Sequence, residues 1–284
     1  METILRSPKA TVVIGHEHPL VVIGERINPT GRKKLAQALE EGNLRFVQEE
    51  AMKQVEEGAQ VLDINVGISG IDEPKLLRET VQCVMQVVDA PLCIDSAMPK
   101  ALEAGLEVYK GKALVNSVNG ENHKLKEVLP LVKQYGAAVV GLTMDDAGIP
   151  KEAEKRLAIA CKIVEEAQRE GIPLEDVIID SLAMAVSTDH TAAMETLKAI
   201  RLIREKLGVN QTLGVSNISF GLPDRYAING LFLALAVFNG VTCPILDPTV
   251  WDIRRAVLVT DMLLGKDEWC MSFISVYREK FPSI

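Results

Sequence analysis

Eight short apolar runs divide the chain, and each ends in a polar or small residue. The runs are nearly continuous rather than alternating, which is typical of strands that are covered on both faces. They predict strands over Val21–Glu25, Val61–Asn65, Pro91–Asp95, Ala113–Ser117, Ala138–Thr143, Val177–Asp180, Thr212–Ser216 and Cys243–Asp247.

The stretches between these runs have the spacing of amphipathic helices. Leu44, Val47 and Ala51 share one helical face, and this segment is expected to end at Gly58. Eight alternations of strand and helix favour a closed (β/α)₈ barrel, a TIM barrel, over an open sheet. The whole chain, residues 1–284, fits one such α/β domain, because these barrels typically take about 250 residues.

Residues 1–20 precede the first run and form an N-terminal extension. Val12–Ile14 and the residues after it are expected to pair back on the first barrel strand, as a short hairpin over the barrel's bottom. His16 and His18 raise the possibility of a metal site. No further ligands lie nearby in the sequence, so an exposed turn is favoured.

The segment Ala227–Phe238 is apolar on every face. A helix of this kind must be buried all round, and an outer helix of a barrel has one face left over. Two alternatives remain open at this point. A subunit interface covers that face, or neighbouring helices or a loop of the same chain do.

Composition narrows the class of protein. Apolar residues make up 48% of the chain, and the net charge of −8 argues against a nucleic-acid or anionic membrane surface. No run approaches the roughly 18 apolar residues of a membrane span, and the N-terminus has no apolar signal core. Five scattered cysteines without a Cys-x-x-Cys motif indicate reduced thiols. We expect a cytoplasmic enzyme with neither a nucleic acid nor a membrane as partner.

Carboxylates and carboxamides gather where the predicted strands end. In a barrel of this kind the strand ends meet the substrate. Taken singly, such a residue can also cap the following helix. No His, Cys or Lys is among them, so the set suits hydrogen bonding to a polar heterocycle better than a nucleophile or a metal ion. The residues are Glu25, Asp63, Asn65, Asp95, Asn116, Asp180 and Asn217.

Six motifs at these strand ends resemble a known family when they are taken in order. They are Gly24–Gly31 (GERINPTG), Leu62–Gly67 (LDINVG), Ile94–Ser96 (IDS), Asn116–Ser117, Gly141–Met144 (GLTM) and Gly214–Ser219 (GVSNIS). From Val21 onward the chain resembles the pterin-binding methyltransferases that handle methyltetrahydrofolate and a corrinoid protein. That group includes enzymes of the acetyl-CoA pathway, of O-demethylation and of betaine systems, and the folate domain of cobalamin-dependent methionine synthase.

The resemblance implies a TIM barrel, a homodimer and a pterin site. Asp180 is implied to hold the aminopyrimidine edge, whose two parallel N–H donors suit a bidentate carboxylate. Asn217 is implied to be the catalytic residue, donating a hydrogen bond to N5 as the methyl group leaves. The full set of implied substrate-binding residues is Asp95, Asn116, Asp180, Gly214, Ser216, Asn217 and Arg225.

Four more polar residues are either partners behind this set or polar core: Glu25, Asn28, Asp63 and Asn65. No corrinoid-binding element is present, so the resemblance implies that a separate corrinoid protein carries the cobalamin and docks at the open barrel mouth. Tetrahydrofolate or its methyl derivative is the implied substrate, and no metal ion is expected on this chain. The direction of methyl transfer stays open.

Two other functions remain in view. Dihydropteroate synthases share the barrel and much of the pterin pocket, but they use a Lys after the seventh strand and a Ser-Arg pair near the end. This chain has neither at those places, and Arg254-Arg255 lies later, in a predicted helix. The other alternative is a non-catalytic pterin- or folate-binding protein that uses the same pocket.

Overall fold

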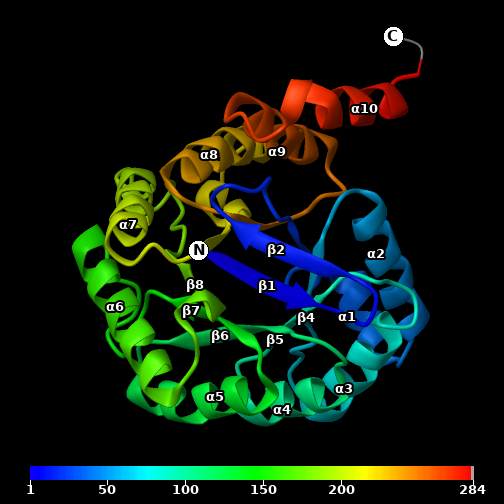
Figure 1. Ribbon diagram of the computed structural model, residues 1–284. Coiled ribbons are helices and arrows are strands. Elements are labelled where there is room, and N and C mark those ends of the chain that lie inside the picture. The colour runs from blue at the N-terminus through cyan, green and yellow to red at the C-terminus, as the bar shows by residue number, and fades with distance from the viewer. Residues whose placement is uncertain (283–284) are drawn as a thin grey trace.

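The computed structural model, which describes residues 1–282, is built around a closed barrel of eight parallel strands (Figure 1). The strands follow one another round the barrel in chain order, and the last pairs with the first. This confirms the predicted α/β barrel. The strands are β3 (Ile23–Ile27), β4 (Val61–Asn65), β5 (Leu92–Asp95), β6 (Leu114–Asn119), β7 (Ala138–Leu142), β8 (Val177–Asp180), β9 (Gln211–Gly214) and β10 (Cys243–Leu246).

Two strands differ from their predicted bounds in ways that affect the mouth of the barrel. The first, predicted over Val21–Glu25, runs two residues later as β3. The seventh, predicted to reach Ser216, stops at Gly214, where a 3₁₀ turn, η2 (Val215–Ser219), takes over. An apolar run marks burial, whereas a strand needs ladder hydrogen bonds, so its ends are the part that the pattern defines least.

Helices form a ring around the barrel (Figure 1). Their apolar stripes face the strands, as Val47 and Ala51 do with no exposed surface at all. Two helices separate β3 from β4, and single helices separate most other strands. The helices are α1 (Lys33–Glu40), α2 (Leu44–Glu56), α3 (Glu73–Val84), α4 (Pro99–Val108), α5 (Asn122–Tyr135), α6 (Ala153–Glu170), α7 (Ala192–Leu207), α8 (Arg225–Asn239), α9 (Trp251–Leu263) and α10 (Met271–Lys280), with 3₁₀ turns η1 (Leu174–Asp176) and η3 (Glu268–Cys270).

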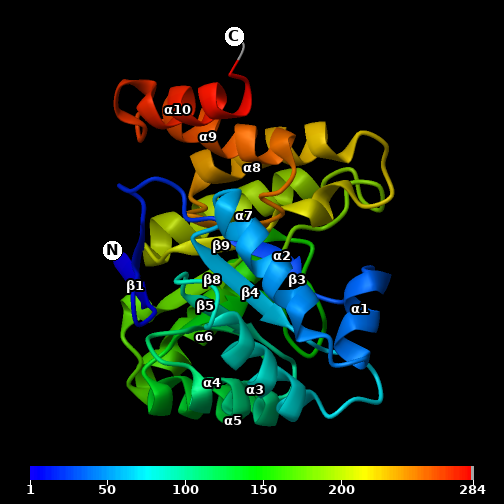
Figure 2. The ribbon, with the colours of Figure 1, turned by 90° about the vertical axis from the view of Figure 1, so that its right-hand side faces the viewer.

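The N-terminal residues form a hairpin across the bottom of the barrel (Figures 1 and 2). Its strands are β1 (Glu2–Arg6) and β2 (Thr11–Gly15), which pair antiparallel. The predicted hairpin is therefore present, but its partner strand is β1 and not the first barrel strand. Leu5 and Ile14 close the lower end of the barrel as fully buried side chains, and Nδ2 of Asn210 donates to the Ile14 carbonyl at 2.9 Å. The hairpin thus leaves only the opposite end open.

The two histidines lie in the turn after β2, as predicted, but they are half-buried rather than exposed. Nε2 of His18 lies 2.7 Å from a carboxylate oxygen of Glu2. This contact ties the turn to β1.

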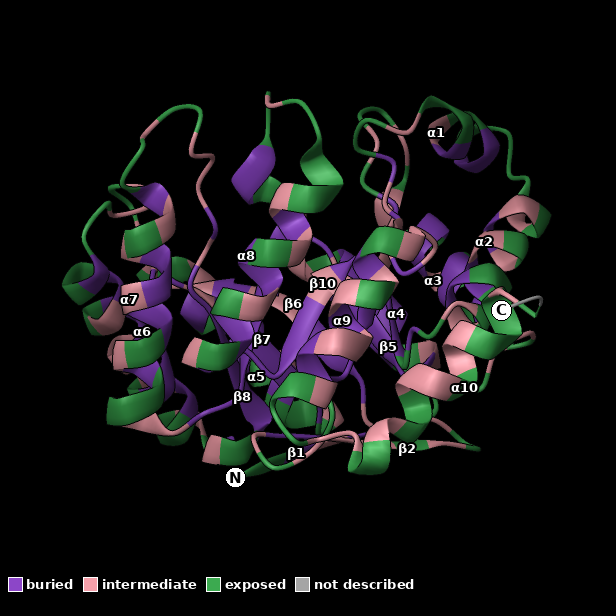
Figure 3. Cartoon of the chain, turned by 90° about the horizontal axis from the view of Figure 1, so that it is seen from above, coloured by how far each residue is buried: buried purple, intermediate pink, exposed green. Residues whose placement is uncertain are grey.

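Helix α8 buries only one of its apolar faces. Phe232 and Leu233 pack against the barrel, whereas Leu231 is 72% and Phe238 69% exposed. The exposed segments of α8 and of its neighbour α9 are visible in Figure 3. Of the two alternatives for this helix, coverage by other parts of the chain is therefore wrong for residues 1–282.

Within residues 1–282, no helix is both long and apolar enough to span a bilayer. All five cysteines are free, and two of them, Cys93 and Cys243, are fully buried in the barrel. Burial raises the pKa of both thiols, so neither is a thiolate nucleophile at neutral pH.

Candidate active site

The open end of the barrel holds a cavity of about 460 Å³, which we call the mouth cavity. It lies at the carboxyl ends of the strands, on the side opposite the hairpin. Of the predicted site residues, all but Asn65 and Arg225 line it. The lining residues are Glu25, Arg26, Asn28, Thr30, Arg32, Asp63, Asp95, Asn116, Asp180, Gly214, Ser216, Asn217 and Ile245.

Strand register brings three of these polar ends to one level. Asn65 on β4 is opposite Asp95 on β5, which in turn is opposite Asn116 on β6. The Nδ2 of Asn65 donates to Oδ2 of Asp95 at 2.9 Å. The Nδ2 of Asn116 donates to Oδ1 of Asp63 at 3.1 Å. Asn65 therefore supports Asp95 from behind without lining the cavity itself.

A bulge in β3 places two consecutive side chains in the cavity wall. Gly24 is opposite Leu62 and Ile27 is opposite Ile64, so β3 has one residue more than β4 over the same length. Normal alternation would send Arg26 to the other side from Glu25, but a bulge re-aims side chains in this way. The sequence prediction missed Arg26 for this reason.

Two further lining residues, Arg32 and Thr30, were missed with it. Nη1 of Arg26 donates to Asp247 at 2.9 Å, and Nη2 of Arg32 donates to Glu50 at 2.7 Å. Both arginines are thus largely neutralised by carboxylates. Arg32 and Thr30 lie in the loop after β3. Their only sequence signal was the Gly24–Gly31 motif, which contains Thr30 and is followed directly by Arg32.

The turn η2 carries Asn217 to the rim of the cavity. A Cβ atom on Gly214 would lie 3.0 Å from the Asn217 Nδ2, so the amide is folded back closely over Gly214. Arg225 holds this turn from outside, because Nη2 donates to the Ser216 carbonyl at 2.8 Å and Nε to the Ser219 hydroxyl at 3.0 Å. Arg225 thus contacts the turn and lies outside the mouth cavity.

The carboxyl groups of the cavity are poorly solvated. Burial raises the pKa of Asp180 to about 7. The hydrogen bond that its carboxylate accepts from the Leu182 N–H at 2.6 Å acts in the opposite direction and lowers this pKa. Burial also raises the pKa of Asp63, and burial together with the Asp63 charge raises that of Asp95. At neutral pH the set therefore contains both protonated and ionised carboxyls, which donate and accept hydrogen bonds respectively.

This arrangement suits a flat heterocycle with a mixed edge of donors and acceptors. The Asp180 oxygen that does not accept from Leu182 has no protein donor among the described residues. Asn116 uses Nδ2 on Asp63, which leaves its amide oxygen for a ligand N–H. A pterin ring has donors and acceptors of this kind, so the residues present fit it.

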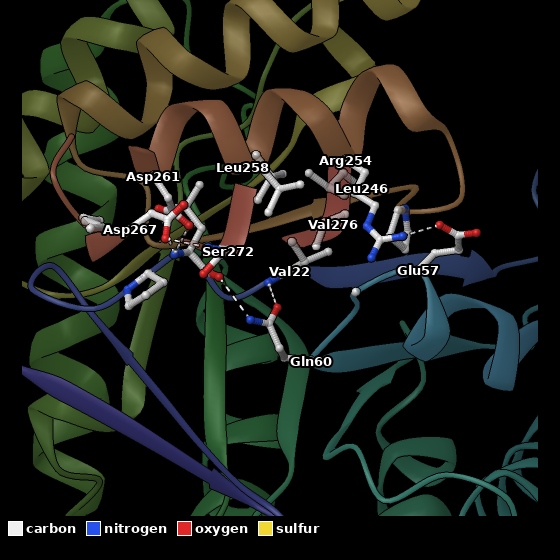
Figure 4. A pocket seen from close by; sticks show the side chains of 16 residues that line it. Val22, Glu57, Gln60, Leu246, Arg254, Leu258, Asp261, Asp267, Ser272 and Val276 are labelled. Carbon is white, nitrogen blue, oxygen red and sulfur yellow. Dashed lines mark hydrogen bonds and ion pairs between the residues drawn. The ribbon is translucent and has the colours of Figure 1, made fainter. Parts of the chain in front are cut away.

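A separate cavity of about 220 Å³ lies on the outside of the barrel, between α9, α10 and the chain entering β3 (Figure 4). Two of its ionisable groups are already paired with protein. Asp261 accepts a hydrogen bond from the Leu20 N–H, and Arg254 pairs with Glu57 at 2.6 Å.

On the rim, Glu121, His123 and Asp146 bring possible metal ligand atoms within 4.8 Å of one another. Glu121 is half-buried, the other two are exposed, and none of the three lines the mouth cavity. The neighbouring Asp145 forms a tight turn with Gly148, with backbone hydrogen bonds of 2.8 and 3.2 Å. The expectation of no metal ion stays a prediction.

The chain is similar in sequence to known proteins. A family model described as pterin binding enzyme matches residues 24–247. The chain is 35% identical over 266 residues to a methylcorrinoid:tetrahydrofolate methyltransferase of Eubacterium limosum, covering 92% of this chain and 97% of that one. It is also 30% identical over 245 residues to methionine synthase of Mycobacterium tuberculosis, covering 82% of this chain and 21% of the synthase.

Solved structures of lower identity share the fold. A dihydropteroate synthase of Yersinia pestis superposes with a TM-score of 0.69 at 14% identity, covering 93% of this chain and all of that one. One of Xanthomonas albilineans gives the same TM-score at 17% identity, covering 92% of this chain and 98% of its own. At this identity the likeness establishes the barrel and nothing of the activity.

Proposed function

The chain belongs to the pterin-binding enzyme family, and on this premise we propose that it moves a methyl group between N5 of tetrahydrofolate and the cobalt of a corrinoid. The 35% identity to the Eubacterium limosum methyltransferase, over nearly the full length of both chains, supports this reaction. The observation that carries the proposal is the grouping of Asp95, Asn116, Asp180 and Asn217 around one cavity.

The difficult step is breaking the bond between N5 and the methyl carbon. Unless N5 gains a proton or a strong hydrogen bond, it leaves as an amide-like anion. We propose that Asn217 Nδ2 donates to N5 and that this bond strengthens as charge builds there, which lowers the barrier more than it tightens binding. Asp180 holds the aminopyrimidine edge and sets the ring's position in the cavity.

The methyl acceptor or donor is a corrinoid carried by a separate protein, which docks over the mouth cavity. Reduced cobalt is itself a strong nucleophile, which agrees with a cavity wall that contains no His, Cys or Lys. In the direction that the Eubacterium limosum enzyme's name describes, the methylcorrinoid gives its methyl group to tetrahydrofolate.

The positions of the two late arginines argue against a dihydropteroate synthase. Arg254 pairs with Glu57 at 2.6 Å and Arg255 with Asp252 at 2.7 Å, and neither lines the mouth cavity. Two acidic residues, Asp224 and Asp247, line the cavity beside the mouth. A diphosphate leaving group in the mouth cavity would therefore meet neither Arg254 nor Arg255 as a free cation.

We further propose that the protein is a homodimer through α8 and α9. Their exposed apolar residues flank a groove of about 450 Å³, and Leu231 and Leu263 are 72% and 75% exposed. Soluble monomers rarely expose large contiguous apolar patches. A second copy of the same face covers both helices at once, as an isologous interface does.

The test is anaerobic mixing of the protein with methyltetrahydrofolate and free cob(I)alamin, followed by the absorbance of methylcobalamin. Asn217→Ala is expected to lose about 10²–10³-fold in kcat, while pterin binding measured by calorimetry largely survives. Asn239→Ala, at a half-buried amide at the far end of α8, is the matched control. Binding without turnover, even with a corrinoid protein as acceptor, would instead establish a binding protein. No binding at all would overturn the pterin site.

A further inference from the structure

Glu25 lies between two cavities. It lines the mouth cavity, and it also lines a neighbouring cavity of about 480 Å³ that we call the side cavity. The side cavity lies between η2, the start of α8 and the end of β10. Its other lining residues are Val215, Ser216, Asp224, Arg225, Tyr226, Asn229, Leu246, Asp247 and Ile253.

The charges around Glu25 are engaged elsewhere. Arg26 donates to Asp247, and Arg225 donates to Ser216 and Ser219. Among residues 1–282 no hydrogen bond or ion pair to the Glu25 side chain is present, and only burial and more distant charges act on it. A poorly solvated carboxyl without a partner costs stability, and such groups concentrate at functional sites.

The side cavity contains a second unsatisfied group. Asn229 is only 5% exposed, and its amide oxygen is buried without a hydrogen-bond partner in the described chain. Buried polar atoms of this kind are normally satisfied by ordered water. Since one water takes roughly 30 Å³ of liquid, the side cavity has room for a chain of several molecules between Glu25 and solvent.

We propose that Glu25 exchanges the N5 proton with solvent through the side cavity, an inference that rests on the proposed methyl transfer. When methyltetrahydrofolate is the donor, the electron pair of reduced cobalt forms the bond to the methyl carbon. The N5–carbon bond breaks, its pair stays on N5, and N5 takes a proton that Glu25 supplies. In reverse, N5 attacks the methyl carbon, cobalt keeps the cobalt–carbon pair, and the N5 proton passes to Glu25.

The surroundings of Glu25 suit both directions. Burial, and then the charges of Asp247 and Asp63, raise the pKa of Glu25 to about 7, while Arg26 and Arg225 act against this. A group with a pKa near the working pH is the most effective acid or base, because it is readily available in either form.

The other carboxyls of the mouth cavity are less suited to this role. Asp63 and Asp95 accept hydrogen bonds from asparagine amides, and Asp180 accepts from a backbone N–H. Each of these groups thus already has a protein donor, whereas Glu25 has none among the described residues. None of the three lines the side cavity, so a proton on them has no direct path through it.

The experiment measures kcat and KM for methyltetrahydrofolate with cob(I)alamin across about pH 5.5–8.5, in full-length wild type, Glu25→Gln and Glu25→Asp. In this direction Glu25 must be protonated, so wild-type kcat is expected to fall as pH rises through about 7. Glu25→Gln is expected to lose about 10²-fold in kcat with little change in KM, and to lose this pH dependence. Glu25→Asp keeps a carboxyl and is expected to keep a fall of kcat with rising pH, but with a shifted midpoint, because the shorter side chain places the carboxyl in different surroundings. Glu49→Gln, an exposed carboxamide exchange on α2, is the control.

An unchanged kcat in Glu25→Gln, or a loss of kcat with the wild-type pH profile retained, would overturn the proton role while leaving the methyl transfer standing. A rise in KM alone would overturn it too, because Glu25 would then only hold the substrate. If wild type shows no turnover with any corrinoid, both proposals fail together. Should Glu25→Gln not fold, an unshifted pH profile in Glu25→Asp would reject the inference.

Discussion

The amide of Asn116 on β6 donates a hydrogen bond to the carboxyl of Asp63 on β4, two strands away, at 3.1 Å. This bond crosses in front of β5 and fixes which end of the Asn116 amide faces the mouth cavity. Asp63 thus orients Asn116, which we propose binds the pterin, and the relationship leads to the first prediction.

Replacing Asp63 tests whether this orientation matters. Asp63→Leu leaves Asn116 free to turn and is expected to weaken pterin binding at least tenfold, since a hydrogen bond to a charged group is worth about 1.5–3 kcal/mol. Asp63→Asn can still accept from Asn116 and is expected to stay within a few-fold of wild type. Calorimetric titration with tetrahydrofolate checks both variants. Equal affinities for the two would reject the role of the bond.

Asp180→Asn should separate binding from stability. The new amide presents an N–H toward the ligand's own N–H donors, so we expect about 10²-fold weaker tetrahydrofolate binding or more. The same change removes a desolvated carboxyl, so the melting temperature without ligand at pH 7.5 (about half a unit above the raised pKa) should rise. Asp146→Asn, at an exposed turn, is the control. A variant that binds as wild type does would show that Asp180 does not hold the ring.

The stability of the ligand-free protein should depend on pH with a definite sign. The folded-state pKa values of Asp180 and Glu25 are raised to about 7, so the folded chain binds these protons more tightly than the unfolded chain. Their contribution to the free energy of unfolding is therefore present at low pH and is lost as pH rises through about 7. Thermal unfolding should show a lower melting temperature at about pH 8 than at about pH 6.5, and Asp180→Asn should reduce the difference. A melting temperature that rises over this range contradicts the account.

Arg225→Lys is expected to lower kcat about tenfold with tetrahydrofolate affinity little changed. Lysine cannot make the two separate bonds that Arg225 makes to Ser216 and Ser219, so η2 and with it Asn217 lose their fixed position. Steady-state kinetics with methyltetrahydrofolate and cob(I)alamin measures the effect. If affinity falls and kcat holds, Arg225 contacts the substrate directly instead.

The oligomeric state tests the exposed face of α8. Light scattering after gel filtration should give about twice the 31.0 kDa chain mass for wild type. Leu231→Asp should shift the protein towards the single-chain mass by placing a charge in the interface. Met194→Asp, at a methionine on α7 that is 68% exposed, should leave the dimer intact. A wild type that runs as a single chain would remove the dimer proposal.

Much of the candidate site was predictable because a polar residue marks the end of most buried barrel strands in the sequence. Asp95, Asn116 and Asp180 each close an apolar run. Parallel pairing brings Asp95 and Asn116 to the same level, and Asp180 lines the same cavity. Arg26 was missed because the prediction assumed that successive side chains of a strand point to opposite sides, and the bulge in β3 breaks this alternation. Arg225 was expected to contact the substrate. Its two hydrogen bonds are made to η2 instead, and the apolar pattern had predicted the start of this turn as the end of a strand.

The sequence by itself determined the barrel, the order of its strands and the chemical character of its mouth, because buried parallel strands need continuous apolar runs and polar residues appear only where they stop. Only the tertiary structure decided which strand the N-terminal segment pairs with and which face of α8 stays uncovered. It also decided that Glu25, which has no hydrogen-bond or ion-pair partner within residues 1–282, lies between two cavities. Those features depend on contacts between segments far apart in the chain. Local patterns record that a residue is apolar or charged, but not which distant residue it meets.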